Sequence, residues 1–446
     1  MKKYLILLAC VFTLNANAQT TQDAKNYVDS NIVTNGNQEI TGAKLNTALN
    51  KMIDAIDTSY FVTLEDFGAI GDGITNDANS LQLAINSKKP ILLLTKKYLI
   101  NTQVNIIDST YIIGQGVGSV LKTTANIQVL NLIGKNIELE NFSIKGNKLG
   151  ANQTAISAIG NNTYTSNIGE CIISNLVIDS FFKAGIYVTN ILGIGDPNFN
   201  HNGGVIIDNC IIKNNGVGVF LDVRAEYNTI SSSSLLKNTS GVKINGGNNA
   251  VVNCNITNNT YGIEVGTGGN DGHGIVSSCR INHNTSNNIR CVGVVKNYLF
   301  SNCMIYAGTI LVSASSGVKI SNCEISITQI NVNNSSYFSL INNFFEINPT
   351  VTFTNNTNMN IRDNFSRVSL NSQLIELPAT TGQATLSAGS VTVSNANIQN
   401  TSIIVCTANG TTNSGFVSVT KTPGVGFTIQ SSNVLDGRIV DYMIKY

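Results

Sequence analysis

The chain has 446 residues, which is enough for a large core and more than one domain. Only 12% of the residues are charged and the formal net charge is +1, so the chain lacks the basic surface that nucleic-acid binding requires. Asn, Ser, Thr, Gly, Ile and Val dominate, which is typical of β proteins, and five Pro with no Trp argue against a Pro-rich linker or a Trp-based sugar platform.

The first residues have the pattern of a secretory signal peptide. Two lysines precede an apolar run over residues 4–14, and an A-x-A cleavage site ends at Ala18. The run is too short to span a bilayer, and no later segment has a transmembrane pattern. We therefore expect residues 1–18 to be a signal peptide and the protein to be secreted, with lipid attachment at Cys10 as the alternative.

Residues 19–58 are expected to form a separate helical leader. Thr41 can cap a helix with a narrow apolar stripe. Two interpretations stay open: the helix packs on the next domain, or it associates with copies of itself as a trimer stalk. The stripe consists of Leu45, Leu49, Met52, Ile53 and Ile56.

The segment 61–77, which reads F-V-T-L-E-D-F-G-A-I-G-D-G-I-T-N-D, predicts a strand and a Gly-rich turn. A helix over 78–87 should follow, with Asp77 as its N-cap and an apolar face. Tight turns explain the glycines better than phosphate binding, because no G-x-G-x-x-G follows the strand. The glycines are Gly68, Gly71 and Gly73, and the apolar face consists of Leu81, Ala84 and Ile85.

A short phrase recurs through the middle of the chain: an apolar/polar alternation, Asn-Cys or a close variant, x-Ile, a polar turn, and Gly-[Val/Ile]-x-[Val/Ile/Leu]. Its marker position recurs every 20 to 25 residues. This irregular period predicts a coiled stack of strands, of about a dozen coils and about 55 to 60 Å long. The markers are Cys210, Ser234, Cys254, Cys279, Cys303, Cys323 and Asn343.

The repeat also predicts what its Cys and Asn residues do. Each marker Cys lies two residues before an inward Ile, so we expect a stack of free thiols inside the coil rather than disulfides or a metal site. The preceding Asn residues suit the bends, where they could form a ladder between coils. They are Asn141, Asn175, Asn209, Asn253, Asn302, Asn322 and Asn342. Insertions are expected at 146–166 and 190–203.

The D-F-G-A-x-G-D-G-x-x-N-D run, the short helix and the strand repeats resemble the pectate-lyase-like (rhamnogalacturonase/epimerase-like) superfamily of right-handed parallel β-helices. The resemblance covers roughly residues 60 to 375. It implies that the first segment forms the first coil and a capping helix. We expect an all-β fold with a single right-handed parallel β-helix over 59–378.

Residues 379–446 change to short strands that alternate with Gly/Asn turns, which predicts a small antiparallel β-sandwich. This region resembles the C-terminal modules of β-helix proteins from phage tails and secreted bacterial proteins. A cap, a trimerisation unit and a glycan-binding module all remain open roles for it.

The family resemblance implies that active sites lie on the sheet built from the Gly-[Val/Ile]-x-[Val/Ile/Leu] strands. Alternation along these strands predicts one exposed column, which we call the predicted column. It is either a functional groove or an ion-pair ladder of little consequence. The column consists of Tyr187, Phe220, Lys243, Glu264 and Arg290, with Asp222 and Asn245 beside it and Arg224, Glu226, Asp271 and His273 in the following loops.

Two chemistries could use these residues. Glycoside hydrolysis needs two carboxyl groups within 10 Å of each other, and Asp222 and Glu264 should lie about 11 to 12 Å apart. A loop acid would therefore have to help, as in the pairs Asp222–Glu226 or Glu264–Asp271. Lyase chemistry could use Lys243 as base and Arg290 against a uronate carboxylate. No carboxylate cluster suggests Ca²⁺, so no metal or cofactor is expected.

The tripeptide at 272–274, G-H-G, also occurs in the polygalacturonase family of β-helix hydrolases. There it follows N-x-D and D-D motifs and precedes R-x-K. Here the preceding coil reads N-G-G-N-N and no R-I-K follows, so that family's catalytic carboxylates cannot be transferred to this chain. His273 is either catalytic or a turn residue.

We therefore predict a secreted protein that binds, and in one interpretation cleaves, an acidic or neutral polysaccharide on the predicted column. The alternative is a non-enzymatic, trimeric protein similar to a tail spike or an adhesin. The catalytic candidates are Asp222, Lys243, Glu264, Asp271, His273 and Arg290, and the substrate-binding candidates are Tyr187, Phe220, Arg224, Glu226 and Asn245.

Overall fold

A computed structural model describes residues 45–47, 49–50, 61–160, 169–190, 202–266, 273–294, 296–347, 349–366, 380–400, 402–410 and 415–445. The predicted signal peptide and Cys10 lie outside these residues, as does the leader helix except for helical residues at 45–47 and 49–50. Over the described ranges, no helix is both long and apolar enough to cross a membrane.

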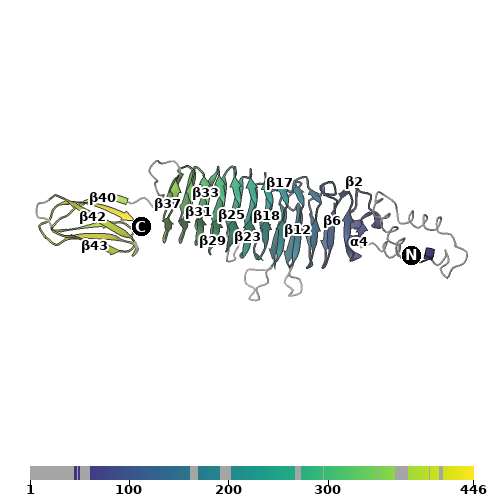
Figure 1. Cartoon of the computed structure of the whole chain (residues 1–446), viewed down its shortest axis with the longest axis horizontal. Coiled ribbons are helices and arrows are strands. Elements are labelled where there is room, and N and C mark those ends of the chain that lie inside the picture. Colours follow the sequence, from purple (N-terminus) through teal and green to yellow (C-terminus); the bar gives the residue numbers. More distant parts are fainter. Residues whose placement is uncertain are drawn as a thin grey trace, which may run out of the picture.

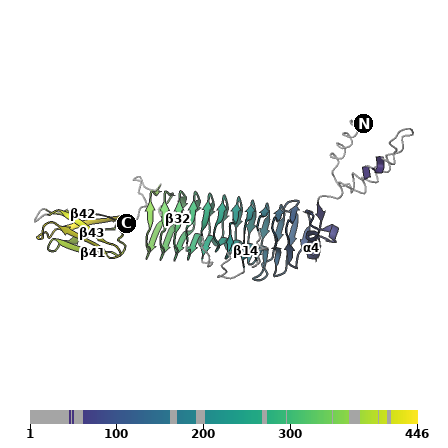
Figure 2. The ribbon, with the colours of Figure 1, turned by 90° about the horizontal axis from the view of Figure 1, so that it is seen from below.

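The central part of the chain is a rod of parallel strands (Figures 1 and 2), which confirms the predicted parallel β-helix. Within the described residues, three long sheets run along the rod, with 13, 13 and 11 strands. Neighbours in each sheet come from successive coils, so every coil adds one strand to each sheet through most of the rod.

The first sheet contains β1 (Val62–Thr63), β3 (Ile91–Leu93), β6 (Tyr111–Gly114), β9 (Glu138–Glu140), β12 (Cys171–Ser174), β16 (Val205–Asp208), β20 (Thr229–Ser231), β23 (Asn249–Val252), β26 (Gly274–Ser277), β29 (Tyr298–Ser301), β32 (Val318–Ser321), β35 (Ser339–Ile341) and β38 (Asn360–Arg362). The second contains β2 (Asp72–Asn76), β4 (Lys97–Leu99), β7 (Val120–Lys122), β10 (Ser143–Lys145), β13 (Val177–Asp179), β17 (Ile211–Lys213), β21 (Ser234–Leu236), β24 (Asn255–Thr257), β27 (Arg280–Asn282), β30 (Met304–Tyr306), β33 (Glu324–Ser326), β36 (Phe344–Phe345) and β39 (Phe365–Ser366).

The third sheet contains β5 (Val104–Ile106), β8 (Gln128–Leu132), β11 (Thr154–Gly160), β14 (Ala184–Asn190), β18 (Val217–Leu221), β22 (Ser240–Ile244), β25 (Tyr261–Gly266), β28 (Asn287–Val292), β31 (Thr309–Ser313), β34 (Gln329–Asn333) and β37 (Thr350–Thr354). A short pair, β15 (Asn202–Gly203) and β19 (Ala225–Glu226), lies beside it. Because β11 is a strand of this sheet, the prediction of an insertion over 146–166 is wrong for that segment.

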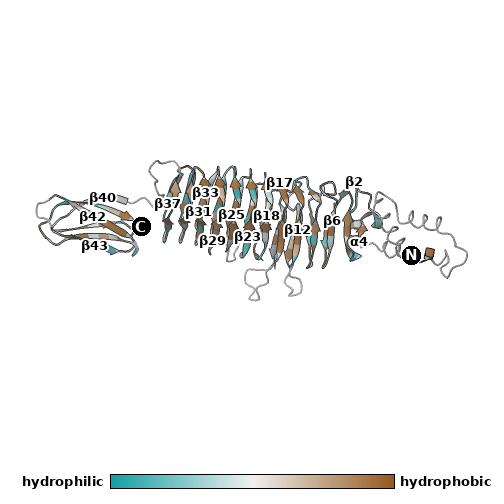
Figure 3. Ribbon diagram, viewed as in Figure 1, coloured by the Kyte–Doolittle hydropathy of each residue, from teal (hydrophilic) through white to brown (hydrophobic). Residues whose placement is uncertain are grey.

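Alternate residues of each strand point into the rod, where they form one continuous apolar core. Apolar residues recur in coil after coil along its length (Figure 3). At each level a buried Ile, Leu or Val of one coil lies over that of the next, as in the series Ile212, Leu235, Ile256 and Ile281.

The N-terminal end of the rod is covered by a short helix, as predicted. The helix α4 (Ala78–Asn86) follows the 3-10 turn η1 (Glu65–Phe67), and its residues Leu81, Ala84 and Ile85 are buried. Asp77 is the N-cap residue, as predicted, but its side chain makes no hydrogen bond to the first turn of the helix. Its carboxylate instead accepts hydrogen bonds from the backbone N–H groups of Ile70 (2.9 Å) and Gly71 (3.2 Å), which fixes the Gly-rich turn.

The seven bend asparagines adopt the left-handed conformation that was predicted, with φ between 50° and 61°. Their ladder is partial. Asn209 donates to Asn175 (2.6 Å) and Asn342 donates to Asn322 (2.7 Å).

A second Asn ladder, which the sequence analysis missed, lies inside the rod where the chain turns toward the third sheet. Asn215, Asn238, Asn259 and Asn284 are all buried. In each step the Oδ1 atom accepts from both the backbone N–H and the Nδ2 of the Asn in the preceding coil, at 2.9 to 3.2 Å. The Nδ2 groups also donate to strand carbonyls, so the ladder satisfies polar groups that the turn would otherwise bury.

The five marker cysteines are buried and free, as predicted. Burial raises the pKa of Cys210 to about 12, so this thiol is protonated at neutral pH. Cys171 and Cys291 are also buried free thiols, whereas Cys406 is half-buried.

The C-terminal residues form two antiparallel three-stranded sheets, in agreement with the predicted sandwich. One has the order β40–β45–β42 and the other β41–β44–β43. Phe427 and Ile429 of one sheet share a core with Val440 and Ile444 of the other. The strands are β40 (Thr380–Thr385), β41 (Ser390–Ser394), β42 (Ile403–Asn409), β43 (Val417–Thr422), β44 (Gly426–Ser431) and β45 (Ile439–Lys445).

We predict that Asn259→Ala lowers the free energy of unfolding by about 2–4 kcal/mol, because it leaves buried donors of Asn238 without an acceptor. Urea denaturation followed by far-UV circular dichroism would measure this. Asn255→Ala, on the outer side of β24, is the matched control and should stay within about 0.5 kcal/mol of wild type. Equal losses for the two variants would contradict a role for the buried ladder.

We also predict that the five marker cysteines resist a thiol reagent at pH 8 in the native protein and react fully in denaturant. Peptide mapping by mass spectrometry without reduction would measure both. A disulfide between any two of them, or fast labelling in the native state, would show that they are not stacked in the core.

Candidate functional site

The structure places the predicted column on neighbouring strands of the third sheet. In the backbone register, Tyr187 pairs with Phe220, Phe220 with Lys243, Lys243 with Glu264, and Glu264 with Arg290. The positions inferred from alternation are therefore confirmed. The functional role assigned to them stays a prediction.

The column is less exposed than expected. Tyr187, Phe220, Lys243 and Arg290 are half-buried, and Glu264 is buried with 7% of its surface exposed. Each side chain is covered by the neighbours above and below it, because coils stack at only about 4.8 Å.

At the aromatic end of the predicted column, two lysines lie over the ring faces. The rings of Tyr187 and Phe220 lie 5.3 Å apart. Lys183 Nζ lies 3.7 Å from the centroid of Tyr187, and Lys243 Nζ lies 5.1 Å from that of Phe220. Burial lowers the pKa of Lys183, although the charge of Asp222 opposes this. Ring faces that already contact lysines are poor platforms for a sugar.

Asp222 is held by its neighbours. It accepts hydrogen bonds from Tyr187 Oη (3.0 Å) and from Asn245 Nδ2 (2.8 Å). Burial, followed by the charge and hydrogen bond of Asp222, raises the pKa of Tyr187 to about 12. The tyrosine is therefore a stable donor to Asp222 and no general base at neutral pH.

Both carboxylate oxygens of Glu264 also contact neighbouring side chains. Ser240 Oγ donates to its Oε2, and Arg290 Nη1 lies 2.5 Å from its Oε1. The guanidinium of Arg290 also lies 5.3 Å from the ring of Tyr261. Lys243 forms no ion pair with any described residue, so the suggested three-residue ladder reduces to the single pair Glu264–Arg290.

Two of the predicted loop residues are less accessible than expected. Arg224 and Glu226 are buried, with 9% and 5% of their surface exposed, so their predicted role as surface contacts is not supported by their position. Asn248 Nδ2 donates to Glu226 at 3.2 Å. Asp271 lies outside the described residues. No group of three His, Cys, Asp or Glu within the described part of the chain could hold a metal ion.

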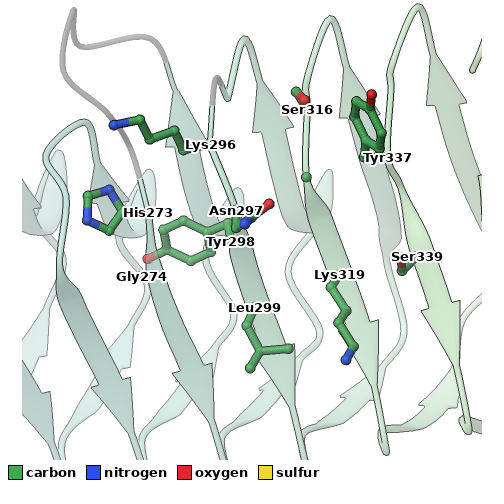
Figure 4. A pocket seen from close by; sticks show the side chains of 11 residues that line it. His273, Gly274, Lys296, Asn297, Tyr298, Leu299, Ser316, Lys319, Tyr337 and Ser339 are labelled. Carbon is green, nitrogen blue, oxygen red and sulfur yellow. The ribbon is translucent and has the colours of Figure 1, made fainter. Parts of the chain in front are cut away.

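His273 lies apart from the column, at a groove on the first sheet that the sequence analysis did not identify (Figure 4). The groove is open and has a volume of about 860 Å³. It crosses the starts of β26, β29, β32 and β35. Its lining includes His273, Lys296, Asn297, Ser316, Lys319, Tyr337 and Ser339.

A signal for this groove was present in the sequence. Lys319 occupies an outward position of the phrase V-K-I-S-N-C, where neighbouring coils have Leu299 and Ser339. Tyr337 occupies a turn position that needs a left-handed backbone, with φ of 53°, and is 61% exposed. The predicted column belongs to the third sheet and therefore contains neither residue.

The comparisons agree with a parallel β-helix that is followed by a small antiparallel module. Residues 378–445 match the family described as K1 capsule-specific polysaccharide lyase, C-terminal domain.

The chain is similar to several phage proteins. The chain is 26% identical over 240 residues to the pre-neck appendage protein of Bacillus phage B103. The matched stretch covers 47% of this chain and 28% of that protein. The chain thus spans under a third of that relative's length. The structure of the pre-mature bacteriophage phi29 gene product 12 matches with a TM-score of 0.55 and 16% identity, over 72% of this chain and 54% of that one. ORF18 of Geobacillus virus E2 matches with a TM-score of 0.51 and 15% identity, over 91% and 80%. The two solved structures show the fold.

We predict that Glu264→Gln lowers the free energy of unfolding by about 1–3 kcal/mol, because it weakens the buried contacts to Ser240 and Arg290. The loss should lie near the lower end, since Arg290 is 38% exposed. Thermal or urea unfolding would measure it. The neighbour Lys243→Gln removes no ion pair to a described residue and should change stability by less than about 0.5 kcal/mol. A larger effect for Lys243→Gln than for Glu264→Gln would contradict the contacts described here.

Proposed function

We propose that the chain is a polysaccharide-binding rod that works outside the cell as part of an appendage, and that it binds its glycan without cleaving it. The observation that carries this proposal is the match of residues 378–445 to the C-terminal domain of a capsule polysaccharide lyase, on a chain whose preceding part is a β-helix. The similarity to a pre-neck appendage protein supports the appendage role.

Binding without cleavage is favoured by the geometry of the predicted column. Hydrolysis by two carboxyl groups needs one acid free to protonate a leaving group and another free to act as base or nucleophile. Asp222 accepts two side-chain hydrogen bonds, and both oxygens of Glu264 contact neighbouring side chains. Lys243 Nζ lies over the ring of Phe220 and forms no ion pair with a described residue.

We further propose that the protein is a homotrimer that associates through its C-terminal module. The outer face of the sheet β40–β45–β42 carries apolar side chains that are exposed in the single chain. Val405 and Met443 pair in register and are 49% and 43% exposed, and Ile403 is 59% exposed. A second copy would cover these side chains and remove their apolar surface from water.

Binding without cleavage predicts that the full chain retains a glycan and releases nothing from it. Incubation with a panel of bacterial capsules and pectins should give a binding signal by biolayer interferometry. It should give no new reducing ends and no absorbance from unsaturated uronate. Release of either product, abolished by Lys243→Ala with Glu264→Ala, would make the protein an enzyme.

The trimer proposal predicts a mass of three chains by light scattering at all concentrations tested. Val405→Glu should produce monomers, because it places a charge on the outer face of the C-terminal sheet. Val425→Glu, at a turn of the same module and 59% exposed, is the control and should leave the trimer intact. A wild-type monomer would overturn the proposal.

A further inference from the structure

The edge of the rod where the chain turns into the first sheet carries two exposed tyrosines in unfavourable backbone conformations. Tyr227 has φ of 58° and is 60% exposed, and Tyr337 has φ of 53° and is 61% exposed. We call the turns that precede β20 to β35 the turn edge. A bulky side chain is rare at positive φ, and neither tyrosine gains much burial in return.

Other coils fill the same turn position with residues that suit it. The bridges Ser316–Ser336 and Ser336–Thr357 align Tyr337 with Gly317 (φ 74°) and with Asn358 (φ 52°). The pairing of Gly203 with Glu226 aligns Tyr227 with Gly204 (φ 79°). Gly and Asn adopt this positive φ at a lower cost than Tyr, so the backbone of the turn does not favour a tyrosine at this position.

The groove at this edge has a positive lining. Lys319 and Lys296 lie in it, together with His273, and none of the described residues that line it is Asp or Glu (Figure 4). Lys319 is exposed and forms no ion pair with a described residue. The outward positions that flank it along the first sheet, Leu299 and Ser339, are uncharged. In a chain of which only 12% is charged, this local excess of one sign is unusual.

The polar groups between the cations suit hydroxyl groups. Asn297, Ser316 and Ser339 line the groove between Lys296, Lys319 and Tyr337. Amide and hydroxyl side chains can both donate and accept hydrogen bonds. A tyrosine ring adds a flat apolar face with a polar tip. Together these groups fit a ligand that carries hydroxyls, apolar ring faces and negative charge.

The shape of the edge indicates a long ligand. The groove is open, and it runs across four successive strands of the first sheet. Five strand steps separate β20, next to Tyr227, from β35, next to Tyr337. At about 4.8 Å a step this is about 24 Å along the rod axis. An enclosed pocket would suit a small molecule, whereas this surface suits a chain laid along the rod.

We infer that the turn edge is a binding track for an anionic polysaccharide, with Tyr337 as a ring platform, Lys319 as the contact to a carboxylate, and Tyr227 as a second platform further along. This rests on the proposed function as a polysaccharide-binding rod and names its ligand class and its site. It moves the ligand from the predicted column of the third sheet to the start of the first sheet.

The test compares two variants of the turn edge with two control variants of the second sheet. Tyr337→Asn copies Asn358, so the melting temperature should be unchanged or slightly higher. Lys319→Gln keeps the length of the side chain and removes its charge. The controls are Lys145→Gln, which makes the same charge change at an exposed site of the second sheet, and Phe344→Thr, which removes an exposed ring from that sheet. Affinities for polygalacturonate, hyaluronate and neutral dextran are measured by biolayer interferometry at two salt concentrations.

We expect the full-length protein to bind at least one polyanion more tightly than dextran, with an affinity that falls as salt rises. Tyr337→Asn and Lys319→Gln should each weaken this binding by about tenfold, as expected for a contact at the centre of a binding site. Both controls should bind within about twofold of wild type.

Three results would overturn the inference. Binding of dextran alone would refute the anionic ligand while leaving the rod a polysaccharide-binding protein. Binding of polyanions that neither Tyr337→Asn nor Lys319→Gln affects would refute the track alone. Absence of binding to all three glycans and to the capsule panel would refute the proposed function as well.

Discussion

The stacking of coils in a fixed register is the constraint on which the rest of this structure depends. Apart from the end strands of the three long sheets, each of their strands is hydrogen-bonded to the equivalent strands of the coils before and after it. A residue's position within its coil therefore decides whether it faces the core or the solvent. The corners are the difficult part, because a turn toward the core buries backbone donors. The ladder of Asn215, Asn238, Asn259 and Asn284 meets this need, since the Oδ1 of each of the last three accepts two hydrogen bonds from the Asn of the coil before.

The same register brings polar side chains of the third sheet into contact. Polar side chains on neighbouring strands lie about 4.8 Å apart, so they can form hydrogen bonds or ion pairs with one another where donor meets acceptor or cation meets anion. Tyr187 donates to Asp222, and Arg290 pairs with Glu264. These groups are therefore a source of stability between coils rather than a set of free reactive groups. A surface where successive coils carry like charges or unrelated side chains, such as the groove around Lys319, is instead left open to a ligand.

Much of the fold could be predicted from the sequence, because the repeat encodes it directly. The alternation placed Tyr187 and Arg290 on one line, the Asn-Cys phrase placed Cys254 in the core, and the bend asparagines have the backbone predicted for them. The hydrogen bonds and ion pairs of the outward side chains were harder to predict. Alternation distinguishes inside from outside, but it does not reveal that Glu264 is covered by Ser240 and Arg290. Nor does it distinguish Asn259, at a buried corner, from Asn322, at an exposed bend, because both lie in short turns between strands.

The buried thiols carry a consequence for where such a rod can form. Secreted domains often depend on disulfides, and therefore on an oxidising compartment, for their final stability. Here the described cysteines of the rod are free and act as small apolar side chains, and the long core supplies the stability. Folding of the rod then needs no oxidant and no disulfide exchange. The rod can therefore have the same structure in a reducing and in an oxidising compartment.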